Sequence, residues 1–394
     1  MGVTTWPAAA VRKALSQLPW QRQPPQGWRS VQFLIWTGRV PEAAARCRSL
    51  ALQFPDRADL TARVGLFALA VGRDLEGAMT RLCDAVEVFP LSAPLRFWLS
   101  EALRRRGAQA QALEQLEIAM QINPAMPELW QAKGRLLLDM GAPHEALLYL
   151  DGALAAMPRS GPLWNDRGLC LEQLGRSENA ATAFRRATRL MPNDGAAWAN
   201  LGLALQKCNQ PAEALRCLRK ALALRAPDPV LLNNIGYSLM ATGHLAEAVE
   251  SYRQASQLDP QSVETMGNLA AALDKAGRRS EALSVLEVAL KAAPGDATLL
   301  NNKGHMLREL GRFKEALACF DQALESNPQD GALLANKAAC HFAMGAYDQA
   351  LVGYRIAALM DPDNREHLWS LGACLERLGK ADEALDCYNQ AIGA

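Results

Sequence analysis

Residues 161–194 read GPLWNDRGLCLEQLGRSENAATAFRRATRLMPND. Three small residues and a proline divide this stretch: Gly168, Gly175, Ala180 and Pro192. The same landmarks return every 34 residues over most of the chain. A fixed period of this length indicates that one structural unit is stacked many times.

The landmarks recur with few exceptions. The proline positions are Pro124, Pro158, Pro192, Pro260, Pro294, Pro328 and Pro362, with Ala226 in the missing slot. Apolar residues follow helical spacing on both sides of the turn glycine, so each unit predicts two helices of about 14 residues. Glycine ends a helix readily because it can adopt the left-handed conformation, and Asn209 replaces it once. A Leu, Phe or Tyr follows the second-helix Ala by four residues, and we expect it to fill the space between units.

This pattern resembles the tetratricopeptide repeat (TPR) family. The matching residues in the quoted unit are Trp164, Gly168, Leu171, Ala180, Phe184, Ala187 and Pro192. The resemblance implies an all-α, right-handed TPR solenoid of about ten to eleven helix-turn-helix repeats. Its main array covers residues 58–394, in about ten repeats, and a degenerate TPR-like unit spans 24–57.

Residues 1–23 are expected to form an N-terminal helical cap, because solenoids need a polar cover over their first unit. Val11, Ala14, Leu15 and Leu18 stand at helical spacing in this segment. We expect Trp6 and Trp20 to pack over the first unit.

An asparagine occupies the sixth position of successive units. The row is Asn200, Asn234, Asn268, Asn302 and Asn336, with Asp166 one unit earlier. A second row, Asn165, Asn233 and Asn301, precedes sixth-position residues at 68-residue intervals. Asn costs about 0.5 kcal/mol relative to Ala inside a helix, so a row of them suggests a compensating role.

The TPR resemblance implies that the first helices line a concave groove that binds extended peptides or partner helices. Neighbouring helices lie about 10 Å apart and an extended chain rises about 3.3 Å per residue, so each Asn would meet every third residue of a peptide. One amide offers an acceptor and two donors, enough for a peptide unit. Tyr237 and His305, three residues past two of the asparagines, are expected to add side-chain preference.

The row also resembles the asparagine ladder of O-linked N-acetylglucosamine transferases, which holds substrate polypeptide along a TPR groove. The alternative is that a harmless surface Asn was copied with its unit during duplication.

Charge and composition exclude several classes of partner. The chain has 42 basic and 41 acidic residues, which argues against nucleic acid as the main partner. Residues 1–57 alone carry eight basic and two acidic residues, a net charge of +6 that fits a solvated cap, an acidic partner or a membrane surface. No apolar run approaches the roughly 20 residues of a transmembrane helix. Nine cysteines without a CxxC pair favour reduced thiols and a cytoplasmic location.

No catalytic constellation is visible. The five histidines do not stand at metal-ligand spacing, and no phosphate loop, GxSxG or HExxH motif is present. We therefore expect a protein that is not an enzyme and that holds no metal or cofactor.

The sequence favours a cytoplasmic TPR adaptor or scaffold that binds extended segments of partner proteins in its groove. Two alternatives stay open: a structural scaffold that self-associates through its ends, or the TPR targeting region of a larger enzyme such as a glycosyltransferase. The last unit leaves Leu385, Tyr388 and Ile392 without an obvious cover, which makes a homo-oligomer through this repeat possible.

Overall fold

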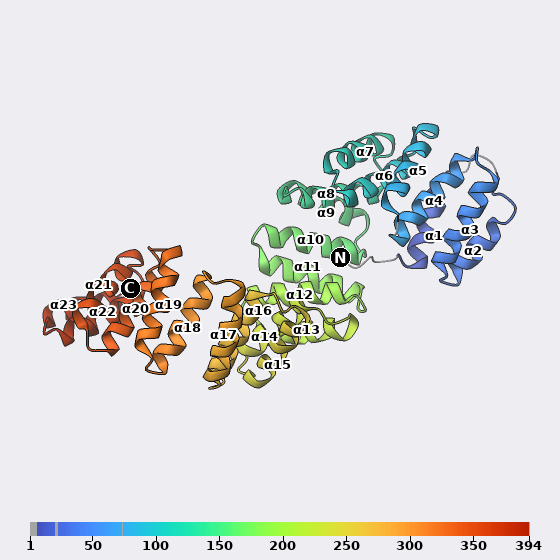
Figure 1. Cartoon of the computed structure of the whole chain (residues 1–394). Helices are drawn as coiled ribbons and strands as arrows, with labels where there is room; N and C mark the ends of the chain where they lie inside the picture. The colour runs from blue at the N-terminus through green and yellow to red at the C-terminus, as the bar shows by residue number, and fades with distance from the viewer. Residues whose placement is uncertain (1–5, 20–22, 73, 394) are drawn as a thin grey trace. The chain divides into compact units, whose positions relative to one another are not determined.

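The computed structural model describes residues 6–19, 23–72 and 74–393. These residues form 23 α-helices and no strand (Figure 1). By its internal contacts the chain divides into two compact units, Met1–Ala204 and Leu205–Ala394, here called unit 1 and unit 2. The expected all-α fold of ten to eleven helix pairs is confirmed.

The helices of unit 1 are α1 (Ala8–Gln17), α2 (Trp28–Trp36), α3 (Val40–Gln53), α4 (Ala58–Val71), α5 (Leu75–Val88), α6 (Ala93–Arg106), α7 (Gln109–Ile122), α8 (Pro127–Asp139), α9 (Pro143–Ala156), α10 (Gly161–Gln173), α11 (Ser177–Leu190) and most of α12 (Gly195–Lys207). Unit 2 continues with α13 (Pro211–Leu224), α14 (Pro229–Ala241), α15 (Leu245–Leu258), α16 (Val263–Lys275), α17 (Arg279–Ala292), α18 (Ala297–Glu309), α19 (Phe313–Ser326), α20 (Gly331–Ala343), α21 (Tyr347–Met360), α22 (Arg365–Arg377) and α23 (Ala381–Gly393).

Each repeat is a pair of packed helices. In unit 1, α4 packs on α5, α6 on α7 and α8 on α9; in unit 2, α14 packs on α15, and the same pairing continues to α22 and α23. The first helix of a pair also contacts the first helix of the next, as α14 does with α16, α16 with α18 and α18 with α20. Each unit therefore presents a continuous row of first helices.

Polar caps begin the first helices of unit 2. The side chains of Asp228, Asp296 and Asp330 each accept a hydrogen bond from the backbone N–H three residues later. Such N-caps satisfy a donor that the helix itself leaves free, which sets the start of the helix in each repeat. The turn glycines have positive φ as expected, and Asn209, which replaces one of them, has φ 55°.

Two consensus residues of the repeat are joined by one hydrogen bond. The indole Nε1 of Trp164 donates to the carbonyl oxygen of Pro158 at 2.9 Å. Trp130 and Pro124 make the same bond at 3.1 Å one repeat earlier. The tryptophan thus ties the start of its helix to the loop that leaves the preceding repeat.

A glycine in the first helix makes room for a ring of the second. A Cβ added to Gly304 would lie 2.6 Å from Cε1 of Phe320, and one on Gly236 would lie 2.8 Å from Cε1 of Tyr252. The expectation that these rings fill the space between repeats is therefore incomplete, because each ring lies directly on the glycine of its own repeat.

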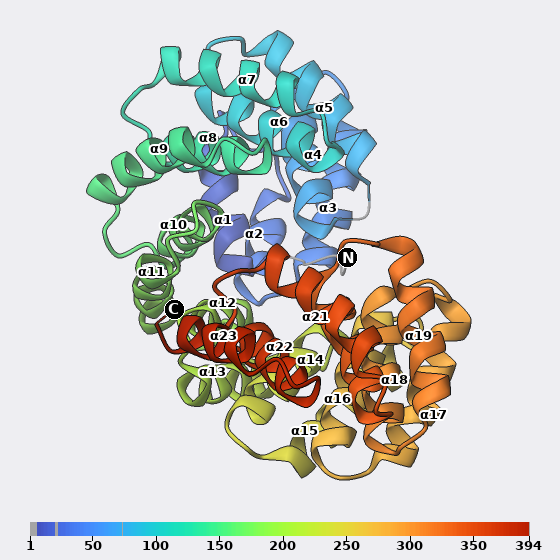
Figure 2. The same ribbon diagram turned by 90° about the vertical axis from the view of Figure 1, so that its left-hand side faces the viewer.

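The N-terminal helix α1 contacts α2 and α4, which are both first helices. In Figure 2, α1 lies on the side of α4, α6 and α8 that faces away from α5 and α7. Val11, Ala14, Leu15 and Leu18 are buried as expected of a packed face. Trp20 lies outside the described residues.

Candidate functional site

The asparagine row follows the first helices in chain order. Asp166 and Asn165 lie on α10, Asn200 on α12, Asn233 and Asn234 on α14, Asn268 on α16, Asn301 and Asn302 on α18, and Asn336 on α20. All nine are half-buried except Asp166, which is buried. A half-buried amide at the meeting point of two helices is positioned both to bond a neighbour and to reach solvent.

The structure joins the two asparagine rows into pairs. Nδ2 of Asn268 donates to Oδ1 of Asn233 at 3.1 Å, and Nδ2 of Asn336 donates to Oδ1 of Asn301 at 2.9 Å. In unit 1, Asn200 donates to Asn165 in the same way at 2.9 Å. Each bond links the sixth position of one repeat to the fifth position of the repeat before it, so the bonds fix neighbouring first helices against each other.

Gln131 extends the paired row in unit 1. Its Nε2 donates to Oδ2 of Asp166 at 3.0 Å, the same fifth-to-sixth register as in the asparagine pairs. Burial raises the pKa of Asp166, although the positive charge of Arg135 and the Gln131 bond act in the opposite direction. Sequence reasoning did not select Gln131, and its place 34 residues before Asn165 was the signal that could have found it.

The remaining two asparagines are not paired in this way. Asn234 turns its Nδ2 to the backbone oxygen of Val230, 2.8 Å away on its own helix. Asn302 has no side-chain hydrogen bond within residues 6–19, 23–72 and 74–393. The residue that would bond Asn302 from the preceding repeat is Gly267, which has no side chain. The row in unit 2 therefore alternates between amides that are held by a neighbour and amides that are not.

Tyr237 and His305 lie three residues past Asn234 and Asn302, on the same helices. Tyr237 is 55% exposed and His305 is half-buried. The equivalent positions Leu169, Leu203, Ala271 and Ala339 are also half-buried. These side chains supply a partly exposed, mostly apolar strip beside the amides.

The N-terminal segment occupies part of the corresponding surface in unit 1. The backbone N–H of Trp6 donates to the carbonyl oxygen of Ala70 at 3.1 Å. The ring centroids of Trp6 and Trp98 lie 4.9 Å apart. The guanidinium carbon of Arg105 lies 5.5 Å from the Trp6 ring centroid. The expectation had placed Trp6 over the first repeat, whereas Trp98 belongs to α6, two repeats further along the chain.

Further contacts hold the segment at the middle of α1 and just after its last residue. Lys13 on α1 forms an ion pair with Glu128 on α8 at 2.8 Å. The guanidinium of the fully buried Arg63 donates to the backbone oxygens of Leu18 and Pro19, both at 2.9 Å. The contacts reach across α4, α6 and α8, so this part of the first-helix surface is filled by the chain itself.

Other chemistry is sparse in the described part of the chain. No group of three or more His, Cys, Asp or Glu side chains there could hold a metal ion. None of its helices is long and apolar enough to cross a bilayer. The buried cysteines are free thiols, and burial raises the pKa of Cys47 to about 12 and that of Cys340 to about 11. Thiols of this kind act as small apolar side chains, because the reactive thiolate is disfavoured.

Comparisons with known proteins agree with the repeat pattern. Residues 41–306, more than half of the chain, match the family model described as cilia and flagella-associated protein 70 C-terminal domain. The chain belongs to this family. Residues 297–330 and 349–394 of this TPR protein each match a family model described as tetratricopeptide repeat. No curated protein sequence matches it.

Two solved structures resemble this chain at low sequence identity. A chain of the APC/C hetero-tetramer Cut9–Hcn1 is 16% identical, with a TM-score of 0.50, and the match covers 80% of this chain and 63% of that one. Yeast Tom70 is 15% identical, with a TM-score of 0.48, and the match covers 96% of this chain and 91% of Tom70. At these identities the likeness concerns the fold alone.

Proposed function

We propose that this TPR protein is a non-enzymatic adaptor that binds extended segments of partner proteins along the first helices of unit 2. TPR folds are scaffolds for protein–protein interaction, which sets the general class. The observation that carries the proposal is the amide row on α14, α16, α18 and α20, with its alternating hydrogen bonds. We locate the site in unit 2 because α1 covers part of the first-helix surface in unit 1.

The paired amides are prepared for backbone recognition. Asn268 uses one N–H on Asn233, which leaves one N–H and its oxygen for a ligand. A side chain already fixed by its neighbour loses little rotamer freedom when a peptide binds. For the asparagines that make it, the bond also offsets the unfavourable helix propensity of Asn, since it joins one repeat to the next.

The unpaired amides give the groove its second kind of contact. Asn302 is free to reorient, and Asn234 can exchange an intrahelical bond for one with a ligand. Paired and unpaired amides alternate from repeat to repeat, so each kind returns after two repeats, about 20 Å or six residues of extended chain. The bound segment would thus be read through its backbone, with Tyr237 and His305 adding contacts to side chains.

The test uses a photo-crosslinking amino acid in place of Tyr237, in the full chain and in the cells that express it. We expect crosslinks to extended partner segments. Changing Asn234, Asn268 and Asn302 together to Ala should reduce crosslinking at least tenfold while helicity is retained. The matched control changes Gln254 and Gln322 to Ala, since these are exposed amides on the second helices α15 and α19. Equal crosslinking by the triple variant and the control would contradict the proposal and favour a purely structural role for the row.

A further inference from the structure

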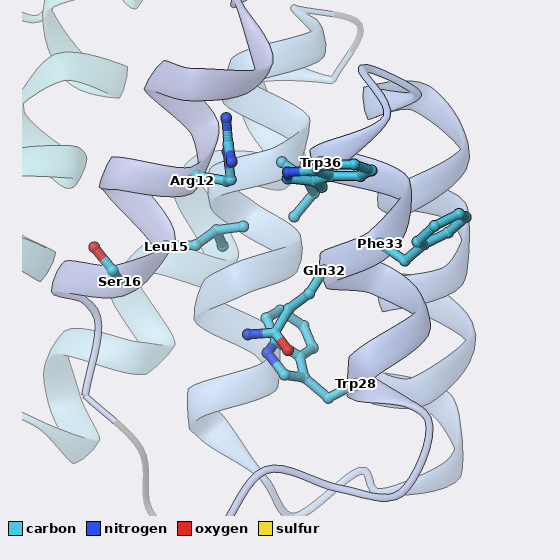
Figure 3. A pocket seen from close by; sticks show the side chains of 8 residues that line it. Arg12, Leu15, Ser16, Trp28, Gln32, Phe33 and Trp36 are labelled. Atoms are coloured by element: carbon cyan, nitrogen blue, oxygen red, sulfur yellow. The ribbon is translucent and has the colours of Figure 1, made fainter.

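A second candidate site lies outside the asparagine row, in a cleft between α1 and α2 (Figure 3). The cleft has a volume of about 660 Å³, within the usual range of about 300–1,000 Å³ for ligand pockets. Buried Leu15, Trp28 and Ile35 form its base. Phe33 and Trp36, which are 58% and 69% exposed, stand at its edge.

Large exposed aromatic side chains need an explanation. The two rings lie 6.4 Å apart between centroids on one face of α2, next to the buried base. Adjacent exposed rings beside a buried apolar base are a feature of protein interaction sites. Trp is also among the residues that contribute most to binding at protein interfaces. The cleft is therefore suited to take up one large apolar side chain.

The charge of the cleft restricts the partner. Arg12 is the one charged residue among the described residues that line it, and no acidic side chain does. Arg12 is exposed and forms no ion pair within the described part of the chain. Residues 1–57 carry a net charge of +6, and of their basic residues Lys13, Arg39 and Arg57 are already paired with acids, whereas Arg12 is not paired with any acid that the structure describes. An unpaired guanidinium beside an apolar cleft complements a carboxylate next to an apolar side chain.

We propose that this cleft docks an acidic segment of a partner protein, with a large aromatic or aliphatic side chain inserted between α1 and α2. Arg12 binds a carboxylate of the segment, and Trp36 covers its apolar side chain, while Phe33 extends the apolar surface on the outer side of α2 (Figure 3). The site is separate from the asparagine row and does not require it.

The test selects ligands from a display library of random twelve-residue peptides with the full chain as bait. We expect enriched peptides to be net acidic and to contain Trp, Phe or Leu. Binding of the enriched peptides, measured by fluorescence polarisation, should fall at least tenfold in Arg12→Glu and in Trp36→Ala. Changing the acids of a bound peptide to Lys should restore its binding to the Arg12→Glu variant.

Two controls make the outcome decisive. Arg48→Glu on α3 changes the net charge equally at another exposed position and should leave binding unchanged. The Asn234→Ala, Asn302→Ala double variant should also bind normally, which separates this site from the asparagine row. The proposal is overturned if no acidic peptide is enriched, or if Arg12→Glu and Arg48→Glu bind the enriched peptides equally.

Discussion

At the scale of single residues, each helix pair depends on a close fit between a small residue and a larger one. Phe320 and Gly304 are both buried, and the ring occupies the space that a Cβ would need. In the preceding repeat the same two positions hold Ala270 and Leu286, a larger residue facing a smaller side chain, and both are fully buried. The chain therefore contains several compatible combinations at one packing site, among them Gly134 with Leu150 and Ala338 with Tyr354 in other repeats.

Gly304→Ala should lower the free energy of unfolding by about 1–3 kcal/mol, since the added methyl group overpacks the site. Adding Phe320→Leu should recover part of this loss, because it recreates the Ala270–Leu286 combination. Thermal and urea unfolding of both single variants and the double variant measure the coupling. Additive losses would show that the ring and the glycine are not the interacting pair.

Asp166 is the one carboxylate in the sixth-position row. Burial raises its pKa, so the folded protein disfavours the charged form relative to the unfolded chain. Its ionisation therefore destabilises the fold. This penalty develops as the pH rises from the ordinary aspartate pKa of the unfolded chain to the raised pKa of the folded protein, and it is fully present above the raised pKa.

Asp166→Asn should raise the melting temperature at pH 7, because it removes the buried charge and still accepts the Gln131 bond. The gain should shrink as the pH falls towards the ordinary aspartate pKa of about 3.9 and disappear below it, where residue 166 is uncharged in both variants. Melting curves across this pH range provide the measurement. A less stable variant at pH 7 would mean that the pairing of the carboxylate with nearby cations outweighs its burial.

At the scale of elements, the first helices form the surface on which the molecule's distinctive contacts occur. In unit 2 they exchange amide hydrogen bonds, and in unit 1 they carry α1. α1 is held by its own buried apolar face, by the Trp6 contact just before its first residue and by the Lys13 ion pair near its middle. An attached helix of this kind can open locally without unfolding the repeats beneath it.

Trp6→Ala combined with Lys13→Glu should loosen α1, since it removes a ring contact and places a carboxylate near Glu128. We expect hydrogen exchange of the α1 amides to rise at least tenfold, which corresponds to about 1.4 kcal/mol. The amides of α14 and α16 serve as an internal reference and should be unaffected. Unchanged protection in α1 would show that Val11, Leu15 and Leu18 are sufficient to hold it.

At the scale of the whole chain, charge and apolar surface are unevenly distributed. Residues 1–57 carry a net charge of +6, whereas the whole chain carries +1. Residues 58–394 therefore carry a net charge of −5. Leu385 and Ile392 on α23 are exposed, whereas Tyr388 is half-buried, its ring 4.8 Å from that of Trp369. Self-association through this last repeat stays a prediction, as does a cytoplasmic location.

The repeat pattern alone was enough to predict the helices, their turns and the number of repeats. Contacts in a solenoid join residues within one repeat or its neighbour, so a short period such as that of residues 161–194 contains nearly all of the information. The positions of Gly304, Asn209 and Trp164 could be understood from their own repeat or the one beside it.

Contacts between neighbouring repeats, and contacts of the non-repeated helix α1, could be found only from the tertiary structure. Asn268 pairs with Asn233 because neighbouring first helices are offset in space, and this offset has no local signature in the sequence. The Lys13–Glu128 ion pair joins residues 115 positions apart, outside any repeat period. The cleft between α1 and α2 follows from the same placement of α1, since a non-repeated segment can be located only by the surface on which it packs.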